Sequence, residues 1–298
     1  MISASVAADR SATSVGQAAA RVLSAMYAHS DRRPWRLGYS QFKLDYLNHL
    51  LRDPAALALF RDSQALQAGH GFRLDARVVE IPWVLANLPM GAASLLDAGS
   101  SLNYSEVLTS PTLAEKEITV LTLAPERRCY WKLGVSYAFG DLRRVAFRDE
   151  WFDAVACIST IEHVGMDNSF YAGNSEVAKR GRSDDFVAAV RELKRVLKPG
   201  GRLYITFPFG RDENHGWFQQ FDSDLADQLI AAFRPGEVQE VVYRFEAQGW
   251  RLSNRTECAD CQFFDVRQSK YFEAKSKLDF PPHFPAGEGA VMCLELTK

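Results

Sequence analysis

The pattern of hydrophobic and polar positions changes in character near Ala93. Before it, apolar side chains recur at helical spacing in four stretches, at about residues 18–29, 41–51, 53–65 and 75–87. After it, short apolar runs typical of buried parallel strands alternate with helical stretches; the runs are residues 94–98, 118–124, 136–139, 152–158 and 202–207. The pattern therefore predicts an N-terminal helical cap over residues 1–75 and an α/β domain over residues 76–298.

The order of strands and helices is typical of a doubly wound sheet. We expect a Rossmann-like, seven-stranded mixed sheet with helices on both faces. The clearest helix spans residues 183–197, with Ser183 as its N-cap and Gly200-Gly201 as its C-terminal exit. Ligands of such sheets bind beyond the carboxyl ends of the strands, so the residues that follow strands are the candidates for a site. Strands that close the sheet are expected in the tail, at residues 238–245, 250–252 and 290–296.

Charge and composition argue against several classes of protein. The chain has 35 basic and 37 acidic residues, a net charge of −2, which disfavours a general nucleic-acid binder. No apolar run approaches the ~20 residues that a membrane-spanning helix needs, and Asp9-Arg10 interrupts any signal-peptide core. Five cysteines, an odd number, do not make a disulfide framework. We expect a cytoplasmic protein without nucleic-acid or membrane partners.

Candidate chemistry lies in three segments that follow or contain predicted strands. LDAGSSLN, from Leu96 to Asn103, ends a strand on an acid and then places small residues where the backbone can approach a ligand closely. GDLRRVAFRDEWFDAVACISTIEHV begins at Gly140, and RELKRVLKPGGRLYITFP begins at Arg191. In this order the segments resemble the class I S-adenosylmethionine-dependent methyltransferases, particularly those that act on small molecules. The resemblance covers about residues 94–208.

The resemblance implies S-adenosylmethionine as cofactor and methyl transfer to a small-molecule acceptor. It implies that the loop after Asp97 and Gly99 lies beneath the methionine part of the cofactor, and that Asp141 contacts the adenine amino group while Leu142 packs on the ring. An acceptor oxygen beside an apolar side chain suits adenine. Taken alone, each of these acids is an ordinary turn or cap residue. The implied cofactor-binding residues are Asp97, Gly99, Ser100, Thr122, Asp141, Leu142 and Ser159.

The chain departs from the family's pattern in two places. Ser101 and Asn103 stand where the family has the second and third glycine of its first motif, although Asn tolerates a positive φ better than most residues. Thr122 stands where the family has an acid that grips both ribose hydroxyls. Either Glu126 reaches back, or ribose is held otherwise, or the cofactor binds weakly. The departures leave open a non-catalytic relative that uses the fold for binding or assembly. A dehydrogenase is disfavoured because the chain lacks a spaced G-x-G-x-x-G.

Methyl transfer from a sulfonium is an in-line displacement for which the protein mainly aligns the acceptor and excludes water. A base is needed only when the acceptor is a hydroxyl or a protonated amine. His163 and His215, after the fourth and fifth strands, are the candidate bases because histidine titrates near neutral pH. Alternatively, His163 only positions the helix that follows and His215 lies on a surface loop.

Glu162 is a third candidate for the chemistry. It is interpreted either as a metal ligand or as the residue that binds an acceptor amine, but no further metal ligands stand at recognisable spacing. We expect oxygen as the first choice of acceptor atom, nitrogen as the second, and no metal.

Three further features carry their own expectations. Cys258 and Cys261 lack the second ligand pair of a structural zinc site, and we interpret them as incidental thiols. The basic cluster within residues 179–182 lies in a long polar loop and either attracts an anionic group of the acceptor or is a solvated face. Apolar walls of the acceptor pocket are expected from Trp217, Phe218 and Phe221.

Overall fold

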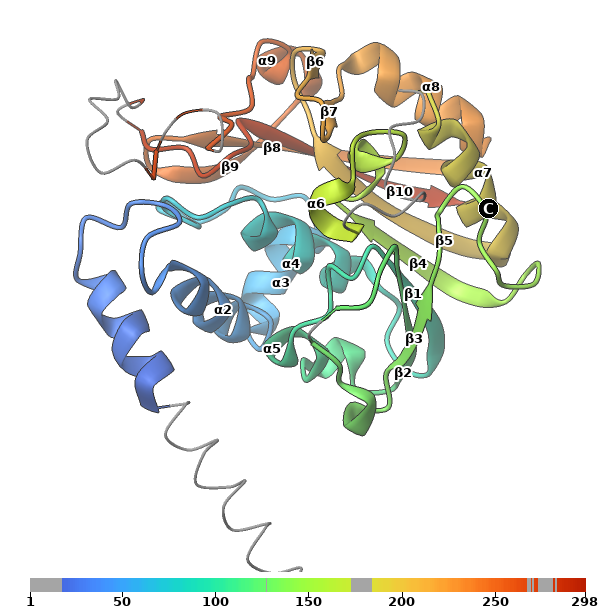
Figure 1. Cartoon of the computed structure of the whole chain (residues 1–298), viewed down its shortest axis with the longest axis horizontal. Helices are drawn as coiled ribbons and strands as arrows, with labels where there is room; N and C mark the ends of the chain where they lie inside the picture. The colour runs from blue at the N-terminus through green and yellow to red at the C-terminus, as the bar shows by residue number, and fades with distance from the viewer. Residues whose placement is uncertain are drawn as a thin grey trace, which may run out of the picture.

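A central β-sheet lies between two layers of helices in the computed structural model (Figure 1). The structure describes residues 18–126, 128–172, 184–266, 269, 271–272, 281 and 283–298. Within this part of the chain the sheet has eight strands in the order β3-β2-β1-β4-β5-β10-β8-β9. Their bounds are β1 Ala93–Ala98, β2 Lys116–Thr122, β3 Ser136–Phe139, β4 Phe152–Ile158, β5 Leu197–Pro208, β8 Glu237–Glu246, β9 Gly249–Ser253 and β10 Ala290–Thr297. A separate small hairpin pairs β6, Glu213–Asn214, with β7, Gln219–Gln220.

The strands from β3 to β5 are parallel, and β10 runs antiparallel between β5 and β8. This arrangement confirms the Rossmann-like mixed sheet, but the described sheet has eight strands instead of the expected seven. The edge strand β9 corresponds to the strand expected at residues 250–252; it forms a tight hairpin with β8 and pairs Trp250 with Phe245. It joins the sheet because Trp250 is buried and its indole N–H donates to the carbonyl of Leu74 at 2.9 Å.

The strands in the middle of the sheet bury side chains on both faces. Neighbours such as Leu95 and Leu96 belong to opposite faces, because successive side chains of a strand alternate. Helices α2, α3 and α4 cover one face, and α7 and α8 cover the other (Figure 1). The helical bounds are α2 Tyr39–Leu50, α3 Pro54–Arg61, α4 Arg77–Asn87, α5 Ser105–Leu108, α6 Ser169–Ala172, α7 Phe186–Val196, α8 Ser223–Phe233 and α9 Arg255–Cys258, with a further helix at residues 18–28. With both faces covered, a ligand reaches this sheet at the strand ends.

Helix α4 contains Pro82 in its interior and still runs unbroken. Proline has no N–H, so the carbonyl four residues earlier, that of Val78, loses its helical partner. The Nε2 of buried His70 lies 2.9 Å from this carbonyl and donates to it, and the Tyr46 hydroxyl lies 3.1 Å from the other ring nitrogen. Burial lowers the pKa of His70, which keeps the ring neutral in this position. Helix α4 then packs on the sheet, where Trp83 contacts Tyr204.

The helix expected at residues 183–197 is α7, and its predicted C-terminal exit is wrong. The helix ends at Val196, and Leu197 already begins β5 by pairing with Phe152. Gly200 has a φ of +74° inside the irregular start of this strand, so the glycines form a bulge instead of a helix cap. Ser183, the expected N-cap, lies outside the described residues. The N-terminal boundary at residue 75 stays a prediction.

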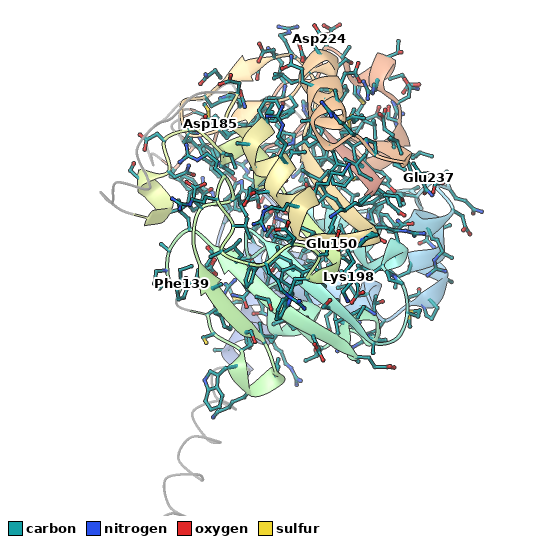
Figure 2. All side chains as sticks on the ribbon, turned by 90° about the vertical axis from the view of Figure 1, so that its right-hand side faces the viewer. Phe139, Glu150, Asp185, Lys198, Asp224 and Glu237 are labelled. Carbon is teal, nitrogen blue, oxygen red and sulfur yellow. The ribbon has the colours of Figure 1, made fainter. Side chains whose placement is uncertain are left out.

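Charged side chains cover the outside of the molecule, with Glu150, Asp224 and Glu237 among the exposed ones (Figure 2). Phe139, at the end of edge strand β3, is an exposed apolar side chain in the same view. Among the residues that the structure describes, no helix combines the length and the apolar surface that crossing a bilayer demands.

Candidate active site

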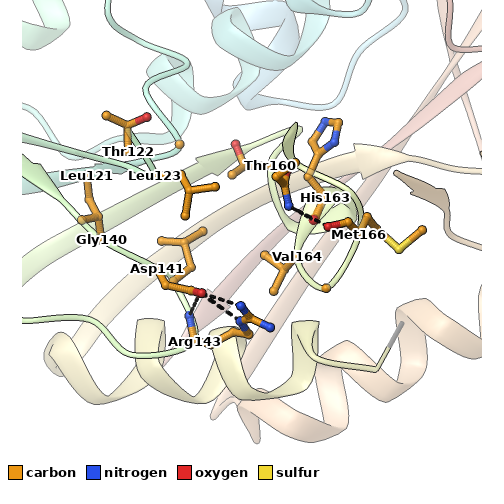
Figure 3. Close-up of a pocket in the computed structure, with 14 residues that line it drawn as sticks. Leu121, Thr122, Leu123, Gly140, Asp141, Arg143, Thr160, His163, Val164 and Met166 are labelled. Atoms are coloured by element: carbon orange, nitrogen blue, oxygen red, sulfur yellow. Dashed lines mark hydrogen bonds and ion pairs between the residues drawn. The ribbon is translucent and has the colours of Figure 1, made fainter. Parts of the chain in front are cut away.

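Three adjoining cavities lie at the carboxyl ends of the parallel strands. The first, the slot, has a volume of about 80 Å³ and is lined by residues that include Leu121, Asp141, Leu142, Val164 and Met166 (Figure 3). The second, the groove, has about 300 Å³ and is lined by residues that include Arg77, Gly99, Thr122, Glu126 and Thr160. The third, the aromatic cavity, has about 360 Å³ and is lined by residues that include Trp35, Glu162, Trp217, Phe263 and Glu288. His163 lines all three, so the cavities adjoin one another at this residue.

The loop after β1 is shaped by Asp97. The Asp97 side chain is buried and accepts hydrogen bonds from the backbone N–H groups of Ser101 at 3.1 Å and Leu102 at 2.9 Å. Burial raises the pKa of Asp97 to about 7, although these two bonds favour its charged form. The carboxylate thus shapes the loop, and Asp97 is not among the residues that line the three cavities.

Gly99 and Ser100 follow Asp97 with positive φ angles. Gly99 has a φ of +120°, and a Cβ added there would lie 2.0 Å from Thr160 Oγ1. Only glycine therefore lets the loop approach the β4 end this closely, and Gly99 lines the slot and the groove. Ser100 has a φ of +65°, and its buried hydroxyl has no hydrogen-bond partner among the described residues.

Glu126 reaches back to the end of β2. Its Oε1 lies 3.3 Å from the Thr122 hydroxyl, and its Oε2 lies 3.4 Å from the amide nitrogen of Asn103. Asn103 is buried and accepts from the Tyr137 hydroxyl at 2.8 Å, which holds its side chain in place. Of the three alternatives left by Thr122, the structure brings a carboxylate to this position from four residues further along the chain.

Asp141 lies in the wall of the slot, but its carboxylate is engaged by Arg143 (Figure 3). It accepts from the backbone N–H of Arg143 at 2.8 Å and from the guanidinium at 2.6 Å. Burial acts to raise the pKa of Asp141, but the hydrogen bonds from Arg143 outweigh it and the pKa lies below its ordinary value. Arg143 also binds Asp185 at 2.5 Å. Any further donor at Asp141 thus shares the carboxylate with Arg143. The local sequence pattern does not predict this contact.

The end of β4 joins a buried network with α4. Ser159 has a φ of +36°, and its hydroxyl donates to Glu80 Oε1 at 2.5 Å. Thr206 Oγ1 donates to the same oxygen at 2.7 Å, and Arg77 binds the other oxygen of Glu80. Glu80 is fully buried, and Arg77 lines both the groove and the aromatic cavity. Sequence reasoning missed both residues. The signal that could have found them is a charged pair at one end of an otherwise apolar helix.

His163 and Glu162 lie side by side in the short helical turn at Ile161–His163. His163 Nδ1 lies 2.8 Å from the carbonyl of Trp217. A carbonyl only accepts, so Nδ1 carries the proton of the neutral ring and Nε2 carries the lone pair. Glu162 is 2% exposed, and its Oε2 has no hydrogen-bond partner among the described residues. Burial raises the pKa of Glu162 well above its ordinary value.

His215 does not line the slot, the groove or the aromatic cavity. Its ring stacks on Phe218 at 4.5 Å between centroids, its Nε2 lies 3.2 Å from Glu213 Oε2, and its Nδ1 lies 3.7 Å from Asp265 Oδ2. The β6–β7 hairpin places the histidine between Glu213 and Asp265, and Asp265 itself lines the aromatic cavity. The histidine supports Phe218 from behind, and the prediction of a second base there is not supported.

The aromatic cavity has a ring-rich wall and several carboxylates. Trp217 and Phe218 contribute to it as expected, whereas Phe221 packs in the core against Phe186 and Phe207. Its remaining rings come from segments far apart in the chain: Trp35, Tyr171, Phe263, Phe264 and Phe272. Its acids are Glu162, Asp265 and Glu288.

The remaining expectations concern cysteines, metals and the basic loop. Cys258 and Cys261 are free thiols near the end of α9 and do not line these cavities. Within the described part of the chain, no three His, Cys, Asp or Glu side chains converge in a way that would hold a metal ion. The basic cluster at residues 179–182 lies outside the described residues.

Residues 99–205 match a family model described as a methyltransferase domain. The search of curated proteins gives no match. A structure titled as a possible histamine N-methyltransferase from Thermotoga maritima is 17% identical, with a TM-score of 0.45 over 85% of this chain and 99% of that chain. The 1,6-didemethyltoxoflavin-N1-methyltransferase of Burkholderia thailandensis is 14% identical, with a TM-score of 0.44 over 91% and 97%. YcgJ of Bacillus subtilis is 11% identical, with a TM-score of 0.43 over 74% and 97%.

Proposed function

We propose, on the premise that residues 99–205 form a class I S-adenosylmethionine-dependent methyltransferase domain, that this enzyme methylates a small molecule held in the aromatic cavity. The observation that carries the proposal is that His163 lines the slot, the groove and the aromatic cavity. An in-line displacement needs the two reacting atoms within ~3–3.5 Å of each other. A cofactor site that opens directly into an acceptor cavity meets this need.

The slot and the groove offer matching chemistry for the parts of the cofactor. Leu142, Val164 and Met166 give the slot apolar walls for the adenine ring. Thr122 and Glu126 offer a hydroxyl and a carboxylate to the ribose hydroxyls, and a carboxylate accepts two such bonds strongly. When bound, S-adenosylmethionine supplies the activated methyl group.

Arg77 is proposed to bind the carboxylate of the methionine part. It lines the groove next to Gly99 and Ser159, and Glu80 holds one arm of its guanidinium. A guanidinium has five N–H donors, so it can bind Glu80 and a second carboxylate together. The backbone of Gly99 packs directly against Thr160 and lines the groove, so it can lie close to a cofactor bound there.

If the acceptor is a hydroxyl, His163 is the residue proposed as its base. Its Nδ1 is bound to the carbonyl of Trp217, so Nε2 is the nitrogen that can take a proton. Its position between cofactor groove and acceptor cavity supports this role.

Calorimetry with the full chain tests the proposal. S-adenosylmethionine and S-adenosylhomocysteine are titrated into the protein, and we expect both to bind with one site per chain. Competition between the two is expected because they share the adenine and ribose contacts. Failure of both to bind at millimolar concentration overturns the proposed function.

A further inference from the structure

Two glutamates line the aromatic cavity with one carboxylate oxygen each that is not hydrogen-bonded within the described part of the chain. Glu162 Oε2 and Glu288 Oε2 are buried atoms without a hydrogen-bond partner among the described residues, and both side chains line the cavity. They reach it from different parts of the fold, since Glu162 follows β4 and Glu288 precedes β10. Two buried acceptors that converge on one cavity indicate a ligand with hydrogen-bond donors.

The other charged groups around the cavity are already matched. Glu80 binds Arg77 and accepts from Ser159 and Thr206. Asp265 accepts from the indole N–H of Trp217 at 3.3 Å and lies near His215. Glu80 partly balances the charge of Arg77, which also acts to lower the pKa of Glu162 and of Glu288. When both of these carboxylates are ionised, the cavity still carries a negative excess.

Burial makes these two carboxylates costly as anions. Burial raises the pKa of Glu162 well above its ordinary value and that of Glu288 to about 7, and the charge of Glu80 adds to both effects. A buried unpaired charge is among the most unfavourable features of a protein interior. A positively charged donor placed between the two acids removes that cost, whereas an anionic ligand increases it.

We infer that the acceptor is an amine carried on an apolar, ring-bearing body, and that Glu162 and Glu288 bind its nitrogen. The inference rests on the proposed function, because it names the substrate class of the same site. The wall supports the ring-bearing body, since Trp217 packs edge to face on Phe218 with centroids 4.6 Å apart and Phe263 packs on Phe218 at a tilt with centroids 4.5 Å apart. Aromatic faces also attract a cation directly.

The transfer balances without a further reactant. An ammonium first gives one proton to Glu162, which frees the nitrogen lone pair. The lone pair then forms the new N–CH₃ bond while the S–CH₃ bond breaks, and S-adenosylhomocysteine is released. The positive charge of the sulfonium passes to the methylated nitrogen, which leaves as an ammonium.

Matched probes test the inference in the full chain saturated with S-adenosylhomocysteine. The probes are 2-phenylethylamine and tryptamine, their alcohols 2-phenylethanol and tryptophol, and the anion 3-phenylpropionate, each titrated by calorimetry at pH 7.5. We expect at least one amine to bind about tenfold or more tightly than its own alcohol, and the anion to bind most weakly.

Two substitutions test whether Glu162 and Glu288 cause the tighter binding of amines. In Glu162→Gln and Glu288→Gln the amine is expected to lose at least tenfold in affinity while the alcohol is unchanged. Glu115→Gln, at an exposed turn, is the matched control and keeps the preference. The probe series in the unmodified chain needs no variant, so a variant that fails to fold does not block the test.

The outcomes separate this inference from the proposed function. Amines that bind no better than alcohols, or no probe binding at all, while S-adenosylhomocysteine binds normally, overturn the amine inference alone. Absence of S-adenosylhomocysteine binding overturns the proposed function instead.

Discussion

The hydroxyl of Thr122 lies 3.3 Å from Oε1 of Glu126, which brings a carboxylate to the end of β2 from outside the strand. Because Asn103 lies 3.4 Å from the other oxygen, the carboxylate spans two loops that both border the groove. The arrangement offers a physical substitute for the acid that the sequence lacks at residue 122.

Glu126→Gln tests this substitute. We expect the affinity for S-adenosylmethionine to fall roughly 10- to 100-fold, because hydrogen bonds to a charged group contribute ~1.5–3 kcal/mol. Calorimetry measures the change. Glu117→Gln, exposed on β2, is the control with the same chemistry and is expected to bind normally. An unchanged affinity in Glu126→Gln would mean that ribose is held by other groups.

Gly99→Ala tests the close approach of the β1 loop to β4. The added Cβ would lie 2.0 Å from Thr160 Oγ1 at a φ of +120°, so the loop must move. We expect the unfolding free energy to fall by about 2 kcal/mol or more and cofactor binding to weaken. Urea unfolding and calorimetry measure the two effects. Gly236→Ala meets only the Thr297 carbonyl at 3.9 Å and is expected to be near neutral in both measurements.

Glu80→Ala tests the buried network between α4 and the strand ends. The substitution leaves the hydroxyls of Ser159 and Thr206 and one arm of Arg77 without their acceptor. We expect a loss of ~3–5 kcal/mol in unfolding free energy, because breaking a buried ion pair leaves an uncompensated charge. Urea unfolding checks it, with Glu117→Ala as the exposed control. A loss below about 1 kcal/mol would contradict the network's structural role.

Glu288→Gln tests the pH dependence of stability. Burial, with the charges of Asp75 and Glu80, raises the pKa of Glu288 to about 7 in the folded protein, above its value of ~4.3 in the unfolded chain. Because the folded protein holds the Glu288 proton more tightly than the unfolded chain does, protonation of Glu288 favours the folded state. This contribution to stability is fully present below the unfolded pKa and is lost as pH rises through about 7.

The measurement for Glu288 is urea unfolding of both proteins at pH 5 and pH 8. From pH 5 to pH 8 the unmodified protein is expected to lose on the order of 2 kcal/mol more than Glu288→Gln. Equal losses in the two proteins would show that Glu288 titrates normally.

Much of the fold and part of the site could be predicted from local sequence. The strands at residues 94–98 and 152–158 are confirmed because a buried strand is a short apolar run. Gly99 and His163 were found because each follows a strand, and parallel strands bring their carboxyl ends to one edge. Leu142 lines the slot for the same reason.

Other features depended on contacts that no local pattern records. Asp97 is turned inward and accepts from two N–H groups of its own loop, and Asp141 is engaged by an arginine two residues away. His215 pairs with acids on its own hairpin and on a later segment. Packing of the folded chain determines which of several available partners each of these side chains contacts.

The order of motifs in the chain was enough to predict the α/β class, the resemblance of residues 99–205 to a methyltransferase domain and the edge of the sheet where the cavities lie, because each depends on neighbours in sequence. Only the tertiary structure decided which charges meet there. Glu80 lies 79 residues before its partner Ser159, and Glu288 comes from the segment just before the last strand. Their carboxylates matter because folding takes them out of water and places them against one cavity, and that environment exists only once the whole chain has packed.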